Sequence, residues 1–493
     1  MKTTITFFLT TLLLTVTKFA VSQSVTFERY YDFGNDDVEQ AYCVQQTTDG
    51  GYIMTGRKAG LGTTKLLVLK VDSIGAYQWH KTYGNNLTYN YGQSIKQTFD
   101  LGYVIVGGMM ETNGQNYVCL LKLNNQGDTL WLKKFTYTNQ NAVWGVTVLQ
   151  NTDGGYSLLS NVVDSTDVNW TTFLTKTDEN GNELWTKKYK KDQGTSPGSF
   201  IATQESGFII AGYTNPSINN NDIYLIKTDS IGDTLWTKTI THPNGYTYLL
   251  SRSNCINETA DGGYFITATV VDSLTTFTRI LIIKTDANGD TLWTKKISDI
   301  DNLWGSAGGF QSFDGGYFIG GEIVYITPDL FTNINFFVVK VSDTGDVIWK
   351  KNFGGATNEY CNYIIPASNS GFVICGMETS WGDGGGVYLI KSDSIGNAQS
   401  YINGIYTNYN YKGASIRLFP NPFSDMANVT IDAAQNSEGI FYIYDAIGNC
   451  VKSIPVTSPT FELNKDNLLT GFYTGVFKPK NISNPIRIKF IIH

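Results

Sequence analysis

The sequence has few of the side chains that enzymes most often use for acid–base or metal chemistry. It contains three histidines, His80, His242 and His493, and none stands at a spacing typical of metal ligands. It has no Gly-x-Ser-x-Gly nucleophile elbow, no His-Glu-x-x-His helix and no phosphate-binding loop. Arginine is also scarce, and no arginine triad is evident. The sequence therefore indicates no catalytic residue, metal site or cofactor.

Other absences limit the class of protein further. The six cysteines form no disulfide framework and no zinc-site spacing, and we interpret them mostly as buried thiols. Beyond the N-terminal region no apolar run approaches the roughly 20 residues that a transmembrane helix needs. The formal net charge of −7 is spread along the chain, which argues against nucleic acid as a partner.

A unit of about 50 residues dominates the sequence and occurs seven times. Each copy has a turn of the Asp-Gly-Gly-Tyr type, which begins at Asp49, Asp100, Asp153, Glu205, Asp261, Asp314 or Asn369. Six copies carry a tryptophan after a second polar turn, at Trp79, Trp131, Trp185, Trp236, Trp293 and Trp349. Because one such unit is too small to bury its own core, the repeat predicts a single architecture of stacked units.

Each unit has the pattern of four β-strands. One strand precedes the glycine turn and a second follows it, as in the run from Tyr52 to Gly56. In six units the third strand is apolar at every position before a final lysine, and in six units the fourth strand carries the tryptophan. Four-stranded units covered on both faces are typical of a β-propeller. We predict an all-β fold with a seven-bladed β-propeller over residues 23–397; an open solenoid and an eight-bladed ring are alternatives.

The two ends of this region complement each other. The tryptophan strand is missing from the seventh copy, after Gly396. The segment from Thr26 to Gly34 resembles the Leu-Trp-x-Lys-x-Tyr-Gly pattern of the tryptophan strands. We predict that this segment is the outer strand of the seventh blade, which closes the ring and removes exposed sheet edges.

Positions that recur in every unit indicate scaffold rather than function. We expect the tryptophans to pack between blades, and each final lysine to form a repeated ion pair or turn contact, as with Lys70 and Asp72. Function is then expected in the variable connections between second and third strands. Those near Trp170 and Trp381 carry tryptophans that either pack locally or stack a sugar. The connections are residues 57–64, 108–116, 161–171, 213–221, 270–278, 322–334 and 377–386.

Residues 1–22 have the pattern of a signal peptide. Lys2 supplies the positive start, a short apolar stretch follows, and small residues precede a predicted cleavage between Ser22 and Gln23. An uncleaved anchor is the alternative. The mature chain is therefore expected to be exported.

A different pattern begins after the repeats. Residues 398–415 have the composition of a polar linker, and residues 416–493 alternate like the strands of a small immunoglobulin-like β-sandwich. This last stretch resembles the type A C-terminal sorting domain of the type IX secretion system of Bacteroidetes. The resemblance is carried by Pro420, Asn421, Pro422, Tyr444, Asp445, Gly448, Gly471, Tyr473 and Lys489. A purely structural end domain is the alternative.

The resemblance implies export through the periplasm and across the outer membrane, with the type IX machinery and an outer-membrane sortase as partners. It also implies that the mature protein is secreted or attached to the outer cell surface. The repeats are similar to those of many exported Bacteroidetes proteins without an assigned activity.

We therefore expect a non-catalytic binding, adhesion or scaffold protein with an unidentified extracellular ligand, either glycan or protein. The enzyme alternative is a propeller-type carbohydrate-active hydrolase that uses paired carboxylates. Turns such as Asp178-Glu179-Asn180-Gly181 faintly resemble calcium loops, but they lack the downstream bidentate acid, and an ordinary hairpin turn is favoured.

Overall fold

The fold is seen in a computed structural model of the chain. It describes residues 25–33, 37–60, 62–84, 88–137, 140–164, 169–191, 194–217, 220–241, 245–248, 254–272, 278–297, 302–326, 332–354, 358–379, 385–399, 415–419, 425–432, 438–445, 450–480 and 486–492. These residues form β-strands and no α-helix. None of the described segments is therefore a helix with the length and apolarity to cross a membrane.

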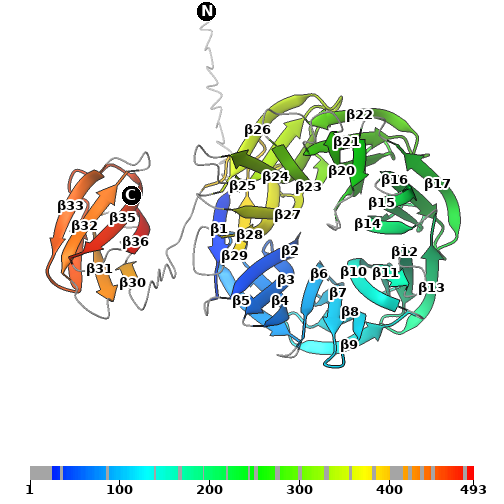
Figure 1. The fold of residues 1–493 in the computed structure, drawn as a ribbon, viewed down its shortest axis with the longest axis horizontal. Coiled ribbons are helices and arrows are strands. Elements are labelled where there is room, and N and C mark those ends of the chain that lie inside the picture. Colours follow the sequence, from blue (N-terminus) through cyan, green and yellow to red (C-terminus); the bar gives the residue numbers. More distant parts are fainter. Residues whose placement is uncertain are drawn as a thin grey trace, which may run out of the picture.

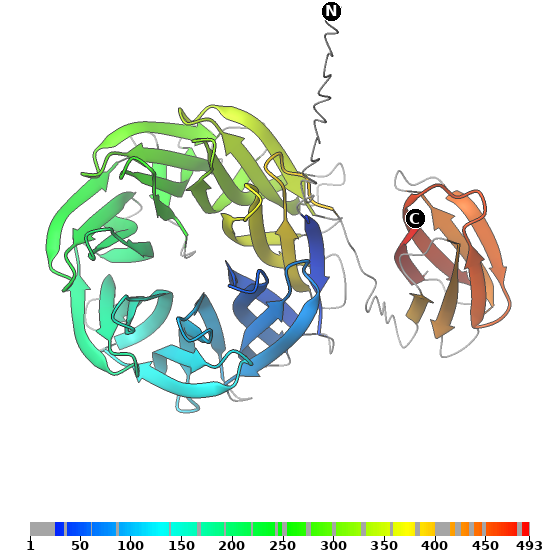
Figure 2. The same ribbon diagram turned by 180° about the vertical axis from the view of Figure 1, so that it is seen from behind.

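Before residue 400, the described strands form seven antiparallel sheets arranged around a common axis in a propeller-like manner (Figures 1 and 2). Strands follow one another in chain order within these sheets, except that β1 (Phe27–Tyr31) joins the sheet that begins with β27. We number the sheets 1 to 7 by their first strands, and the sheet that begins with β27 is sheet 7. The first strands lie nearest the axis in Figure 1. They are β2 (Val38–Gln46), β6 (Asn90–Gln97), β10 (Gln140–Gln150), β14 (Thr195–Ala202), β18 (Gly245–Tyr248) with β19 (Ile256–Glu258), β23 (Asn302–Gln311) and β27 (Glu359–Pro366).

The second and third strands form the middle of each sheet and are almost entirely buried. The second strands are β3 (Tyr52–Gly60), β7 (Tyr103–Met110), β11 (Tyr156–Asp164), β15 (Phe208–Ser217), β20 (Tyr264–Asp272), β24 (Tyr317–Ile326) and β28 (Phe372–Glu378). The third strands are β4 (Thr63–Val71), β8 (Asn116–Leu123), β12 (Trp170–Thr177), β16 (Asn220–Thr228), β21 (Thr278–Thr285), β25 (Thr332–Val341) and β29 (Gly386–Lys391).

The fourth strands form the outer rim and carry the tryptophans. They are β5 (Tyr77–Tyr83), β9 (Thr129–Phe135), β13 (Glu183–Tyr189), β17 (Thr234–Ile240), β22 (Thr291–Ile297) and β26 (Val347–Phe353). In sheet 7 the outer strand is β1 (Phe27–Tyr31), which pairs with β29 across a gap of more than 350 residues. Phe27 lies opposite Lys391, as Trp79 lies opposite Lys70 in sheet 1. The N-terminal segment thus takes the predicted place.

The Asp-Gly-Gly turns need their two glycines for different reasons. Gly50 has a φ of 80°, a left-handed conformation that glycine adopts without strain. Leu101 takes the same turn position with a φ of 64°, so this position tolerates a side chain. Gly51 is different, because a Cβ there would run into the carbonyl oxygen of Val71 on the third strand. This second glycine is accordingly present in all seven turns.

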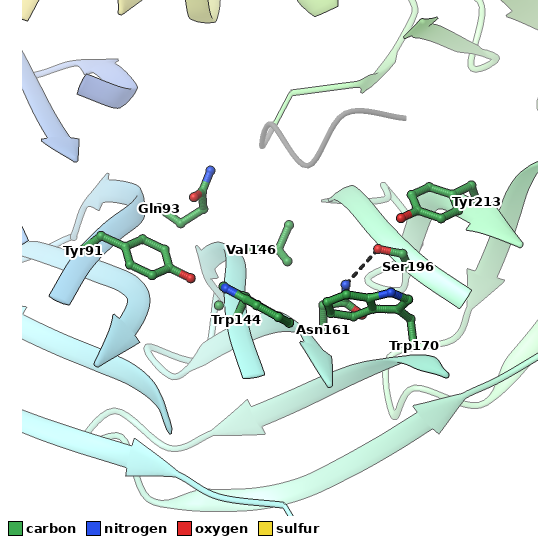
Figure 3. A pocket seen from close by; sticks show the side chains of 9 residues that line it. Tyr91, Gln93, Trp144, Val146, Asn161, Trp170, Ser196 and Tyr213 are labelled. Carbon is green, nitrogen blue, oxygen red and sulfur yellow. Dashed lines mark hydrogen bonds between the residues drawn. The ribbon is translucent and has the colours of Figure 1, made fainter. Parts of the chain in front are cut away.

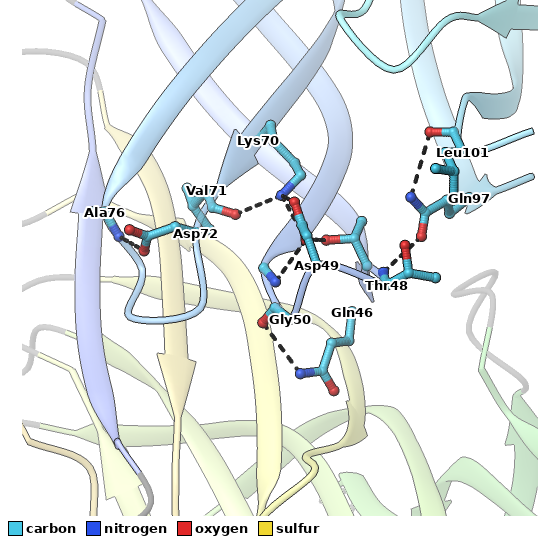
Figure 4. A network of polar contacts seen from close by, with 12 residues as sticks. Gln46, Thr48, Asp49, Gly50, Lys70, Val71, Asp72, Ala76, Gln97 and Leu101 are labelled. Atoms are coloured by element: carbon cyan, nitrogen blue, oxygen red, sulfur yellow. Dashed lines mark hydrogen bonds and ion pairs between the residues drawn. The ribbon is translucent and has the colours of Figure 1, made fainter.

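The lysine that ends the third strand forms an ion pair in six of the seven sheets, as predicted, but with a different partner. Lys70 contacts Asp49 of the glycine turn at 2.9 Å (Figure 4). Five further sheets have the equivalent pair of lysine and acid at 2.6 to 3.1 Å. The predicted partner, Asp72, instead accepts hydrogen bonds from the N–H groups of Ile74 and Ala76 in its own turn. Antiparallel pairing of the second and third strands brings the lysine to the first turn, and spacing along the sequence does not reveal this.

Neighbouring sheets are joined at the outer rim. A Cβ on Gly127 of sheet 2 would meet the ring of Trp79 of sheet 1 at 2.8 Å, so the indole packs directly on the glycine. Lys81 adds an ion pair of 2.5 Å to Asp128. The same packing joins Trp131 to Gly181, Trp185 to Gly232, Trp236 to Gly289, Trp293 to Gly345 and Trp349 to Gly396. The prediction that the tryptophans pack between units is confirmed.

Strand order also determines which connections share a face. Since the strands alternate in direction, both turns of each sheet lie on one face of the ring. On the other face the first strands begin and the second strands connect to the third; we call this the loop face. The connections are shorter than predicted, because pairing continues past the apolar run. In sheet 1, β3 and β4 remain paired as far as Gly60 and Thr63.

The C-terminal strands form two antiparallel sheets with one hydrophobic core. That core includes Val429, Phe441, Phe477 and Ile488, which come from both sheets. One sheet has the order β30 (Ser415–Phe419), β31 (Met426–Asp432), β34 (Thr460–Asn464). The other has the order β33 (Cys450–Val456), β32 (Gly439–Tyr444), β35 (Gly471–Pro479), β36 (Ile486–Ile492).

Candidate functional site

A hollow of about 240 Å³ lies at the loop face where sheets 2, 3 and 4 meet (Figure 3). We call it the aromatic hollow. The first strands of the three sheets supply most of its wall, and β11, β12 and β15 supply the rest. It is lined by Tyr91, Gln93, Trp144, Gly145, Val146, Asn161, Trp170, Ser196 and Tyr213.

Two tryptophans form one side of the aromatic hollow. Trp144 is on the first strand of sheet 3, and Trp170 begins the third strand of the same sheet. Their ring centroids are 4.7 Å apart and their planes are inclined by 41°. Trp144 keeps 37% of its surface exposed, although β10 is the first strand of its sheet and lies near the axis of the ring of sheets. Aromatic surface is therefore available to a ligand.

The aromatic hollow also has polar groups whose hydrogen-bonding capacity is incompletely used. The Asn161 Nδ2 group donates to Ser196 Oγ at 2.8 Å (Figure 3), but Asn161 Oδ1 has no hydrogen-bond partner among the residues that the structure describes. The hydroxyl of Tyr91 has none either. Both residues are more than nine-tenths buried. Burial raises the pKa of Tyr91 well above its ordinary value, so the phenol stays neutral and keeps its proton to donate.

The residues of the aromatic hollow are those at which the repeat varies. Tyr91, Trp144 and Ser196 each stand nine residues before the acid of their glycine turn, and so occupy one position in three consecutive units. Sheets 1 and 6 have Gln40 and Gly305 there. These residues share one position of the repeat but differ in chemical type from unit to unit. That variation is the signal in the sequence that points to this site.

A second group of unusual residues consists of buried acids where sheets 1 and 7 meet. Glu39, Glu359 and Glu378 are fully buried. Glu359 and Glu378 are direct cross-strand partners on β27 and β28. The Glu39 N–H donates to the carbonyl of Gly385, next to the residue that pairs with Glu378. Three acidic residues thus lie on neighbouring strands where sheets 1 and 7 meet.

Glu39 has the electrostatic character of a potential acid catalyst. Its burial raises its pKa to about 7, although the ion pair with Lys58 opposes the rise. Unlike Trp144 of the aromatic hollow, however, Glu39 has no exposed surface that a substrate would reach. The raised pKa alone does not make this corner an active site.

No group of three or more His, Cys, Asp or Glu among the described residues has the arrangement to hold a metal ion. The turns that faintly resemble calcium loops use their acids internally. Asp178 Oδ1 accepts hydrogen bonds from the N–H groups of Asn180 and Asn182 at 2.9 and 2.7 Å. His80 lies on β5 and stacks on Phe33 with 3.8 Å between ring centroids.

Some of the predicted sorting residues have a clear structural setting. Tyr473 is buried on β35, its hydroxyl donates to the Leu469 carbonyl at 2.7 Å, and its ring stacks on Phe490. This contact explains the spacing of Leu469, Gly471 and Tyr473, because the tyrosine ties the strand to the chain just before it. Tyr444 and Asp445 lie at the end of β32.

The other predicted sorting and cleavage residues lie either on a strand or outside the described residues. Lys489 is on β36, opposite Thr474. Pro420, Asn421, Pro422 and Gly448 lie outside the described residues, as do the predicted cleavage residues Ser22 and Gln23 and most of the linker. The roles assigned to all of these residues stay predictions.

Comparison with known proteins identifies the C-terminal region. Residues 417–493 match the family model of the Secretion system C-terminal sorting domain. The resemblance stated for residues 416–493 is thereby confirmed. The chain is an exported protein that is secreted or located at the outer surface, and its C-terminal region interacts with the type IX secretion machinery. No curated protein sequence matches the chain.

Solved structures resemble the chain only distantly. A puromycin hydrolase variant is 11% identical over 79% of this chain, with a TM-score of 0.49, and this chain spans only 58% of its length. PorZ, a surface component of the type IX secretion system of Porphyromonas gingivalis, is 9% identical, with 92% and 81% of the two chains covered and a TM-score of 0.25. An α-L-arabinanase of Penicillium chrysogenum is 10% identical, with 51% and 94% covered and a TM-score of 0.34. Similarities this weak carry no information on function.

Proposed function

We propose that this chain is a non-catalytic binding protein of the bacterial surface or medium. In this proposal it is a closed seven-bladed β-propeller over residues 23–397 that holds an extracellular ligand in the aromatic hollow. An immunoglobulin-like domain over residues 416–493 directs its export. The observation that carries the proposal is the hollow itself, which combines exposed indole, buried polar atoms without partners and no carboxylate among its described lining residues.

Support for a closed ring of seven comes from a contact that recurs around the molecule. Six tryptophans each pack on a glycine of the following sheet. In sheet 7 the equivalent residue is Phe27, whose ring packs on Gly75 of sheet 1, and the Tyr31 hydroxyl donates to the Gly75 carbonyl at 2.6 Å. Tyr83 makes the corresponding bond to Gly127 of the next sheet. The same contact thus joins each sheet to the next one and sheet 7 to sheet 1.

The proposed route of export rests on the ends of the chain. We assign residues 1–22 as a signal peptide cleaved before Gln23. We also assign an outer-membrane sortase as a partner of the C-terminal domain, which that enzyme would recognise through the sorting residues named above. Residues 398–415 serve as the linker.

The binding proposal is tested by applying the full-length protein and its Trp144→Ala variant to an array that carries both extracellular glycans and peptides. We expect a ligand that binds the wild-type protein and is lost in the variant, because truncating the indole removes the largest contact surface of the hollow. The bound ligand should be recovered unchanged. Release of a cleaved product, or identical binding profiles of the two proteins, would contradict the proposal.

A carbohydrate-active hydrolase is the second candidate, and the acids at the corner of sheets 1 and 7 are the observation that favours it. A pair of carboxylates with one raised pKa is the requirement of glycoside hydrolysis. In that case the array experiment yields cleaved glycan, and Glu39→Gln abolishes the cleavage while Trp144→Ala does not.

A further inference from the structure

We infer that the aromatic hollow binds a single neutral sugar ring, such as the terminal residue of an extracellular glycan. This inference rests on the proposed binding function and adds the chemical class of the ligand. Three independent properties of the lining residues support it: the size and aromatic character of the hollow, its unsatisfied polar atoms and its lack of charge.

The size and shape of the aromatic hollow limit the ligand to one small ring. Its 240 Å³ is below the range of about 300–1,000 Å³ that is usual for drug-sized ligands. The inclined planes of Trp144 and Trp170 present indole surface on one side. Indole faces carry partial negative charge and attract the weakly positive C–H groups on the face of a sugar ring. The indole surface is apolar and lies beside solvent. It therefore suits a molecule with one apolar face and polar edges.

The unsatisfied polar atoms call for a ligand with neighbouring hydroxyl groups. Asn161 Oδ1 accepts and the Tyr91 hydroxyl both donates and accepts, and neither has a partner among the described residues. Buried groups of this kind are rare in folded proteins, because each costs the free energy of its lost hydration. A sugar hydroxyl is both donor and acceptor, so it satisfies either group. A purely apolar ligand satisfies neither.

The charge of the aromatic hollow selects among sugars. Among the described lining residues there is no Lys, Arg, His, Asp or Glu. An acidic sugar would lose its hydration there without gaining a cation, which disfavours its binding. The same reasoning disfavours charged peptides. A neutral hexose has no such penalty.

The inference is tested by calorimetric titration of the full-length protein with the methyl glycosides of glucose, galactose and mannose, and with glucuronic acid. We expect at least one neutral glycoside to bind and glucuronic acid not to bind. Trp144→Ala should weaken the affinity by about tenfold through loss of stacking. Tyr91→Phe should weaken it by about fivefold through loss of one hydrogen bond.

Two controls separate binding from folding. Tyr360→Ala truncates an aromatic residue at the same repeat position as Trp144, but in sheet 7 and outside the hollow, and it should leave the affinity unchanged. Tyr91→Phe should leave thermal stability unchanged or higher, because its hydroxyl has no partner in the free protein. Weaker sugar binding without weaker folding therefore assigns Tyr91 to the ligand.

The outcomes distinguish this inference from the proposed function. Absence of binding to all the neutral glycosides at millimolar concentration overturns the inference, as does preferred binding of glucuronic acid. Affinities that are insensitive to both Trp144→Ala and Tyr91→Phe also overturn it. If the array instead yields a peptide whose binding depends on Trp144, the inference fails and the binding function stands. If sugar binds but glycan is cleaved, the non-catalytic function fails and the sugar site stands.

Discussion

Among the seven lysines that end the third strands, six lie beside an acid and one does not. Lys391 of sheet 7 is buried, but its glycine turn carries Asn369 at the position of the acid. Its Nζ lies 5.7 Å from the ring centroid of Tyr52, and burial lowers its pKa. A buried ammonium group without a carboxylate destabilises the fold, so sheet 7 has a weak point that the other sheets lack.

We predict that Asn369→Asp increases the free energy of unfolding by about 1 kcal/mol, through a new ion pair with Lys391. The matched control is Asp314→Asn, which removes the equivalent pair and should decrease it by a similar amount. Both are measured by denaturant unfolding at neutral pH. A loss of stability in Asn369→Asp would contradict this account of Lys391.

The gain from Asn369→Asp should also depend on pH. The pKa of Asp314 is lowered to about 2: its burial alone would raise the pKa, but hydrogen bonds from Lys340, Ser312 and Gly316 outweigh that effect. A carboxyl group whose pKa falls on folding stabilises the protein above its unfolded pKa of about 4. We therefore expect the gain to be complete near pH 5 and to disappear as the pH falls toward 2.

At the scale of elements, the outer strand of sheet 7 determines how the two ends of the repeat region are held. Phe27 on β1 is fully buried, and its ring makes an edge contact with Tyr52 of sheet 1 at 5.9 Å between centroids. β1 therefore contacts two sheets, since it pairs with β29 of sheet 7 and packs on sheet 1. Among the described strands of the seven sheets, no other is so distant in sequence from its partner.

We predict that Phe27→Ala lowers the free energy of unfolding by about 3 kcal/mol, as expected for a fully buried phenylalanine. Amide exchange should then accelerate in β29 and in the neighbouring strands of sheet 1, because both lose their contact with β1. Phe313→Ala is the control: Phe313 is 88% exposed and its removal should have little effect. Faster exchange confined to β1 would show that this strand does not fasten the ring.

At the scale of the whole molecule, we expect the repeat and the C-terminal domain to have separate roles. The repeated contacts build a nearly symmetric scaffold, and the aromatic hollow and the acidic corner are the places where that symmetry is broken. The C-terminal domain has its own hydrophobic core and matches a sorting domain by itself. Destination is thus a property of the C-terminal domain, and the ligand recognition that we propose is a property of the repeat region.

We predict that deletion of residues 416–493 leaves the protein in the periplasm of a host with a type IX system, because the remaining chain lacks the sorting domain. Cell fractionation followed by immunoblotting measures the distribution. The Trp144→Ala variant of the full-length chain is the control and should be exported normally. Unimpaired export of the deleted form would contradict a sorting role for the C-terminal domain.

Much of the fold was predictable because it repeats. Seven glycine turns and six tryptophan strands indicated four-stranded units, and the resemblance of the segment around Phe27 to a tryptophan strand indicated its pairing. The partner of Lys70 was predicted wrongly, since the interaction joins residues that only strand pairing brings together. Trp170 was noted in the sequence, and Asn161 falls in the predicted connection 161–171, although the structure places it on β11. Trp144 and Tyr91 were missed, because they share no local motif.

The sequence by itself determined the all-β class, the repeat and the sorting domain. Each of these depends on local patterns such as glycine turns, apolar alternation and short motifs. Only the tertiary structure decided which acid pairs with each lysine, that the strand connections share one face, and that residues of three units form the aromatic hollow. These features depend on contacts between distant segments, and contacts of that kind leave no periodic trace along the chain.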